Sequence, residues 1–157
     1  MHDAGGSWWA WLENSGVAQA MRQWLWLYPA IEIIHIVGFV LLVGAVIMFD
    51  LRLLGLSPRL PLAKLARHLL PWSWLGLALI VPSGLLMLSA HASEWAGNPV
   101  FGIKLALIAA AGLNAWLFHR RAKWHAPQPS SRTRAAGALS ISLWLGVLVC
   151  GRLLAYV

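Results

Sequence analysis

Charged residues are scarce in this chain: they make up 11% of its 157 residues, and only five of them are acidic. Soluble globular domains usually contain about 25% charged residues. Hydrophobic residues reach 60%, and the mean hydropathy is +0.69. A soluble domain of this size could not bury so much apolar surface, whereas a lipid bilayer would cover it. The composition therefore predicts an integral membrane protein.

Cysteine and the common catalytic motifs are also nearly absent. Cys150 is the only cysteine, which excludes an intrachain disulfide and a metal site built from several thiolates. The chain has no glycine-rich phosphate loop, no HExxH motif and no nucleophile elbow. Its few acidic residues do not form a pair of neighbouring carboxylates. An enzyme that acts alone is therefore not expected.

Four apolar stretches account for most of the chain, at about residues 29–49, 72–90, 99–118 and 135–156. A helix needs about 20 mostly apolar residues to cross a bilayer, and each stretch approaches that length. A short amphipathic segment over 62–69 precedes the second stretch. The sequence predicts an all-α fold, in which residues 29–157 form an integral membrane four-helix bundle.

The basic residues are concentrated in the segments that join these stretches. The net charge is +7, and nine of the twelve Lys and Arg residues follow the first or the third stretch: Arg52, Arg59, Lys64, Arg67, Arg120, Arg121, Lys123, Arg132 and Arg134. Such loops mark the cytoplasmic side of a membrane protein. We therefore expect a bacterial inner-membrane protein with both termini in the periplasm. The loops do not form a face that could follow phosphates, so no nucleic-acid partner is expected.

The first 28 residues are rich in tryptophan and precede the first apolar stretch. The first Lys or Arg is Arg22, so the basic start of a signal peptide is missing. Apolar residues recur at three- and four-residue steps among polar ones, with Trp8, Trp11 and Trp24 among them. Tryptophan favours the headgroup level. This pattern predicts an interfacial amphipathic helix on the bilayer, and a tryptophan-rich lid packed on neighbouring helices is the alternative.

Two ionisable residues, Glu32 and His35, lie three residues apart near the start of the first apolar stretch. This spacing places both side chains on one helix face. Ionisable groups inside a membrane usually face a partner. Arg152, close to the outer end of the fourth stretch, is expected at similar depth. The sequence therefore predicts a polar cluster of Glu32, His35 and Arg152, although Arg152 could instead reach the outer interface.

Histidines at other helix ends suggest a cofactor. Two imidazoles from different helices can hold the iron of a b-type haem. The candidate ligand pairs are His35 with His91 and His68 with His119, with Arg152 available for an anionic group of the cofactor. Each histidine also has a structural interpretation: His35 would hydrogen-bond a neighbouring helix, and the other three would lie at the membrane interface.

A set of motifs resembles a family of small bacterial four-helix membrane proteins of uncharacterised function. The motifs are Leu27-Tyr28-Pro29-x-x-Glu32-x-x-His35-x-x-Gly38, Asp50-Leu51-Arg52-Leu53-Leu54-Gly55, Asn98-Pro99-x-Phe101-x-x-Lys104, Gly112-x-Asn114, Phe118-His119 and Gly151-Arg152. The resemblance implies the fold and the topology. A more distant likeness is to membrane cytochrome b subunits and to copper-resistance membrane proteins.

Three functions follow as hypotheses. The leading one is a haem b-binding electron-transfer subunit that serves a periplasmic or membrane redox partner. The second is a copper- or other metal-handling membrane protein that uses His35 as a ligand. The third is a non-catalytic membrane anchor or assembly subunit.

Overall fold

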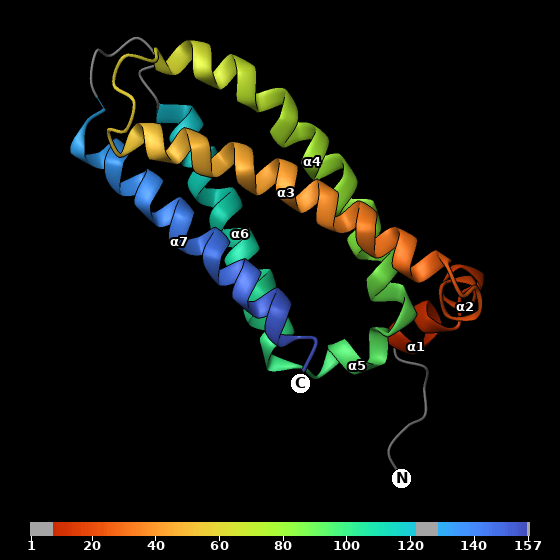
Figure 1. Cartoon of the computed structure of the whole chain (residues 1–157). Helices are drawn as coiled ribbons and strands as arrows, with labels where there is room; N and C mark the ends of the chain where they lie inside the picture. The colour runs from red at the N-terminus through yellow and green to blue at the C-terminus, as the bar shows by residue number, and fades with distance from the viewer. Residues whose placement is uncertain (1–7, 122–128, 157) are drawn as a thin grey trace.

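The computed structural model describes residues 8–121 and 129–156 (Figure 1). This part of the chain contains helices and no strand. The helices are α1 (Trp8–Glu13), α2 (Gly16–Gln23), α3 (Leu27–Leu53), α4 (Leu62–Ala90), α5 (Ala92–Ala96), α6 (Pro99–Arg121) and α7 (Ser131–Leu153).

Four of these helices, α3, α4, α6 and α7, are long and apolar enough to cross a membrane. Many of their large apolar side chains point away from the protein, among them Ile33, Val40, Leu85 and Leu113, each of which is more than half exposed. In water such a surface would be unfavourable, whereas lipid covers it. The all-α, four-helix prediction is confirmed, and the chain is a multi-pass membrane protein.

The second long helix starts earlier than the second apolar stretch. Helix α4 begins at Leu62 and continues through Pro71, so the amphipathic segment 62–69 and the following span form one helix. Proline at position 71 has no N–H to donate to the carbonyl four residues earlier. The Ser73 hydroxyl donates to the Leu69 carbonyl at 3.2 Å, one turn from this point. Because α4 is continuous from Leu62 to Ala90, the proline lies inside the helix and does not end it.

The long helices form two pairs. Helix α3 packs along α4, and α6 packs along α7. The pairs meet mainly through α3 and α7, where Gly137 lies against Leu53: a Cβ atom on this glycine would be 3.2 Å from the Leu53 Cβ. The rings of Phe49 and Phe118 are 5.8 Å apart and join α3 to α6 in the same region. Away from this contact the two pairs diverge (Figure 1).

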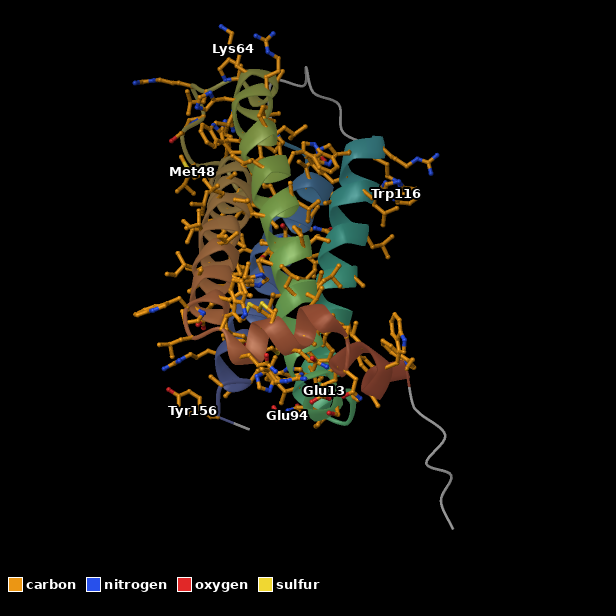
Figure 2. The ribbon with its side chains drawn as sticks, turned by 90° about the vertical axis from the view of Figure 1, so that its right-hand side faces the viewer. Glu13, Met48, Lys64, Glu94, Trp116 and Tyr156 are labelled. Atoms are coloured by element: carbon orange, nitrogen blue, oxygen red, sulfur yellow. The ribbon has the colours of Figure 1, made fainter. Side chains whose placement is uncertain are left out.

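The two ends of the bundle differ in composition. At one end, here called the basic end, α3 and α6 finish and α4 and α7 begin. Most of the basic residues lie there: Arg59, Lys64, Arg67, Arg120, Arg121, Arg132 and Arg134. Lys123 lies outside the described residues. The opposite end, here called the α1–α2 end, carries Glu13, Glu94 and Tyr156, as Figure 2 shows, with Lys64 at the far side.

The short helices α1, α2 and α5 pack together at the α1–α2 end. The Arg22 guanidinium donates to the carbonyls of Ala90 at 2.9 Å and Glu13 at 2.8 Å. The first of these carbonyls lies at the end of α4, so Arg22 ties α2 to that helix. The Glu13 carboxylate accepts hydrogen bonds from both the hydroxyl and the backbone N–H of Ser93. These contacts fix the N-terminal helices to the bundle.

Tryptophan side chains are not what holds α2 in place. Ala18 and Met21 are its buried residues. In contrast, tryptophans of the N-terminal segment are largely exposed, among them Trp8, Trp11, Trp24 and Trp26. The segment packs on neighbouring helices through small and flexible residues and presents these tryptophans outward. Residues 1–7 lie outside the described part of the chain.

Candidate functional site

His35 of α3 contacts Ser83 of α4 within the part of the bundle nearer the α1–α2 end. The His35 Nδ1 atom lies 2.9 Å from the Ser83 Oγ atom. Ser83 is only 3% exposed, and His35 is half-buried. The partner that hydrocarbon cannot supply to this imidazole is therefore a hydroxyl on the adjacent helix.

The other hydrogen bonds of Ser83 indicate which atom is the donor in its contact with His35. Its hydroxyl donates to the Leu79 carbonyl at 2.5 Å and lies 3.2 Å from the Ile80 carbonyl. A serine hydroxyl has one hydrogen to donate and can also accept. Because that hydrogen is directed to the backbone of α4, Ser83 accepts from the N–H of His35 Nδ1. A neutral His35 then carries its proton on Nδ1 and a lone pair on Nε2.

Gly84 makes room for the imidazole against α4. A Cβ atom at this position would lie 3.1 Å from the His35 Cε1 atom and 3.6 Å from Nδ1. The edge of the ring formed by these two atoms faces α4, and Nε2 points away from Gly84. Pro82, Ser83 and Gly84 are consecutive, so one short sequence combines a proline, a hydroxyl partner and the space for the ring.

Lys104 of α6 is the third polar residue of this region. It is half-buried, and its Nζ atom lies 3.8 Å from the position that a Cβ on Gly151 would occupy. The ammonium group therefore lies against α7. His35, Ser83 and Gly84 form what is called here the His35 site, and Lys104 belongs to the other helix pair in the same half of the bundle.

The sequence did not identify Ser83 or Lys104 as residues of this region. From the sequence, Ser83 is expected only to hydrogen-bond a carbonyl that Pro82 leaves unpaired, and Lys104 is only a basic residue near the start of a span. The Pro82-Ser83-Gly84 run, inside an apolar helix, is the one available signal. It cannot specify which neighbouring helix supplies the ring that Ser83 binds.

The structure does not bring Arg152 into the predicted cluster with Glu32 and His35. The Arg152 guanidinium donates to the Tyr156 hydroxyl and lies over the Tyr156 ring, 4.8 Å from its centre. Both Glu32 and Arg152 are exposed, and no ion pair joins them in the described structure. Helices α3 and α7 meet near the basic end and diverge toward the end that holds these residues (Figure 1). Similar depth therefore does not bring the two side chains together.

The structure does not bring His35 and His91 together as an axial pair. The His91 ring packs edge-on against Tyr28, with ring centres 6.0 Å apart, and its Nδ1 atom lies 3.4 Å from Glu94. Tyr28 precedes His35 by seven residues, which is about 10 Å along a helix. A single iron could not be reached from both positions in this arrangement.

The other two histidines lie near the basic end. His68 is exposed on the first turns of α4. His119 is exposed near the end of α6, and its Nδ1 atom lies 2.8 Å from the Ala115 carbonyl of the same helix. Neither belongs to the His35 site.

Among residues 8–121 and 129–156, no group of three or more His, Cys, Asp or Glu side chains is placed to hold a metal ion. Comparisons of the chain with protein-family models, with curated proteins and with solved structures find no match.

Proposed function

We propose that this protein is a haem b-binding electron-transfer subunit, with His35 Nε2 as a ligand of the iron. The observation that carries the proposal is the hydrogen bond from His35 Nδ1 to Ser83 Oγ. Histidines that bind metals almost always donate their other ring N–H to an oxygen, which fixes the tautomer and the ring orientation. The His35 site has this arrangement before any cofactor binds, and Nε2 carries the lone pair that a metal requires.

A haem suits the site better than a bare metal ion does. The porphyrin supplies four nitrogen ligands, so the protein needs to supply only one or two. A copper ion held by the protein alone would require further ligands near His35. A haem therefore needs only one ligand from this site, and the His35 imidazole can provide it.

Lys104 suits a cofactor that carries carboxylates, as haem does. An ammonium group in a membrane interior is costly unless it is paired. A carboxylate of the cofactor would be such a partner, and Lys104 would then hold it near His35. When bound, the haem would supply one-electron redox chemistry, while Ser83 would orient the ligating imidazole.

The cellular location is part of the same proposal. Nine basic residues in two connecting segments favour a cytoplasmic basic end in a bacterial inner membrane. His35 would then lie in the periplasmic half of the bilayer. A haem at His35 would then be closer to a redox partner in the periplasm, or in that half of the membrane, than to one in the cytoplasm.

The test is the visible spectrum of the purified protein. We expect a reducible Soret band after production with haem supplied, loss of that band in His35→Gln, and its retention in the matched variant His68→Gln. Thermal unfolding in detergent shows whether each variant is folded. If the folded wild-type protein binds copper and no haem, and His35→Gln loses the copper, the function is metal handling instead. Absence of both, or an unchanged band in folded His35→Gln, would reject the proposed site.

A further inference from the structure

Asp50 is a buried acidic residue close to the end of α3. Its position just after an apolar stretch predicts a residue at the membrane interface, and the same is true of Arg52. The structure instead buries both, with 5% of each residue exposed. Asp50 lies where α3 meets α7: its backbone carbonyl is 3.3 Å from the position that a Cβ on Gly137 would occupy.

Arg52 does not neutralise Asp50. The Arg52 guanidinium donates to the carbonyls of Leu60 at 2.8 Å and Pro58 at 3.0 Å. These bonds direct it to the segment that joins α3 and α4. On α7, Arg134 lies one turn before Gly137, which packs beside Asp50. Its guanidinium lies near Gly55 of the same segment, 4.0 Å from the position that a Cβ on Gly55 would occupy. His119 of α6 lies against the Ala115 carbonyl. Within the described residues, no ion pair to the Asp50 carboxyl group is formed.

The side chain of Ser140 on α7 lies beside the Asp50 carboxyl group. Serines in helices often donate to the carbonyl four residues earlier, which here belongs to Ala136. Asn114 of α6 donates its side-chain N–H to that carbonyl at 3.0 Å. Ser140 is itself 8% exposed, so the neighbour of the Asp50 carboxyl group on α7 is also closed off from solvent.

The second oxygen of the carboxyl group is buried without a partner. Asp50 Oδ2 has no hydrogen bond in the described structure and essentially no exposed area. A carboxylate that is removed from water and receives one hydrogen bond keeps most of its desolvation penalty. A neutral carboxylic acid avoids the cost of the charge. Ionisable residues inside membrane helices are commonly proton-binding sites for this reason.

We infer that Asp50 is an intramembrane proton-binding site, in which the carboxyl group carries a proton on one oxygen and Ser140 holds the other. Because α3 ends at Leu53, within one turn of Asp50, the basic end is the nearer side of the bundle from which a proton could reach this carboxyl group. This inference is independent of the His35 site, since fifteen residues of α3, or about 22 Å, separate the two positions.

The test uses the fact that the chain contains only two aspartates, Asp3 and Asp50. In an Asp3→Asn protein with ¹³C-labelled aspartate, Asp50 is the only labelled carboxyl group. Infrared spectra of this protein in lipid vesicles at neutral pH are expected to contain a carboxylic acid C=O band that moves in D2O. Ser140→Ala is expected to shift the band without removing it, and Glu32→Gln, which changes an exposed acid, to leave it unchanged.

Two outcomes would overturn the inference. The first is a labelled carboxylate signal at neutral pH, with no acid band, in a protein that thermal unfolding shows to be folded. The second is a carboxylate signal together with thermal stability that rises with added sodium, which would make Asp50 a cation ligand. Because the label reports on the native residue, the test does not depend on whether Asp50→Asn folds.

Discussion

Gly38 and Gly76 face each other where α3 crosses α4. A Cβ atom on Gly76 would lie 2.7 Å from the Gly38 carbonyl oxygen and 2.6 Å from the Leu42 nitrogen. A Cβ on Gly38 would lie 3.0 Å from the Gly76 carbonyl oxygen. Small residues let helix backbones approach this closely in membranes. His35 lies one turn from Gly38 and Ser83 two turns from Gly76, so this crossing sets the distance between the two side chains of the site.

Replacing Gly76 with alanine is expected to destabilise the protein by about 1–3 kcal/mol, the usual cost of forcing extra volume into a packed interface. The added methyl group would contact backbone atoms, which cannot move aside as a flexible side chain can. The free energy of unfolding in mixed micelles measures this change.

Gly102 and Gly112 of α6 provide matched controls, because nothing lies within 4 Å of a Cβ at either position. There, alanine is expected to be neutral or to stabilise by up to about 1 kcal/mol through its higher helix propensity. Equal losses at Gly76 and Gly102 would show that the crossing is not closely packed.

Ser83→Ala is expected to release the His35 ring and change its tautomer. The hydroxyl is the acceptor that favours a proton on Nδ1, and its loss leaves a half-buried ring N–H without that partner. A cost of about 1 kcal/mol in stability is expected for the lost hydrogen bond. ¹⁵N chemical shifts of histidine-labelled protein report which ring nitrogen carries the proton.

Ser89→Ala is the control for this experiment. Ser89 is also buried in α4, and its hydroxyl donates to the Leu86 carbonyl at 2.7 Å. It therefore has the same chemical nature without the histidine contact. If His35 keeps the Nδ1–H tautomer in Ser83→Ala as it does in Ser89→Ala, Ser83 does not determine the tautomer.

The fold was predictable because membrane-spanning helices are indicated by the hydropathy of consecutive residues. Four long apolar stretches have few stable alternatives to membrane helices, and the bundle follows from them. Pro71 is where local signals misled: proline and tryptophans suggest a boundary after 62–69, yet α4 continues. A proline in a membrane helix is tolerated where nearby hydroxyls and neighbouring helices satisfy the backbone, and a sequence does not show that.

The site was less predictable because it depends on how helix pairs are oriented. His35 was identifiable as an anomaly from its position alone. Its partner Ser83 depends on how α4 is rotated about its axis, which the sequence does not show. Equal depth in the membrane likewise does not place Arg152 beside Glu32, because the two helices diverge toward that end. The burial of Asp50 was not predictable for a related reason: a charged residue after an apolar stretch is typical of an exposed interface residue, and the approach of α7 at Gly137 buries it.

The contact between Glu13 and Ser93 is expected to make docking of α1 pH-dependent. Hydrogen bonds from the Ser93 hydroxyl and backbone N–H hold the pKa of the Glu13 carboxyl below its ordinary value of 4.5. A carboxyl group with a lowered pKa in the folded state stabilises that state above its unfolded pKa. The contribution is therefore present at neutral pH and is lost as the pH falls below 4.5 and through the folded pKa.

Ser93→Ala should raise the pKa of Glu13 toward its ordinary value, and Ser93→Thr should restore much of the shift because it keeps the hydroxyl. A titration of ¹³C-labelled glutamate followed by NMR measures both. An unchanged Glu13 pKa in Ser93→Ala would indicate that this hydrogen bond does not form in the membrane-bound protein.

The orientation proposed for the bundle leads to the final prediction. The segments at the basic end carry most of the positive charge, and such segments remain in the cytoplasm because translocating them is unfavourable. Cysteines introduced at Ser57 and Ser130 should therefore be protected from an impermeant thiol reagent in intact cells and should react after the cells are opened. Both native residues are exposed, so shielding by the protein would not explain the protection.

A cysteine at Gly97, an exposed position beside α5, should react in intact cells. Gly97 is preferable to Ser93, whose replacement would also remove the bond to Glu13. The native Cys150 is buried, so the unmodified protein gives the background signal. Reaction at Ser57 and Ser130 with protection at Gly97 would reverse the orientation and place His35 in the cytoplasmic half of the bilayer. The redox partner would then have to be sought on that side, while the His35–Ser83 geometry would be unaffected.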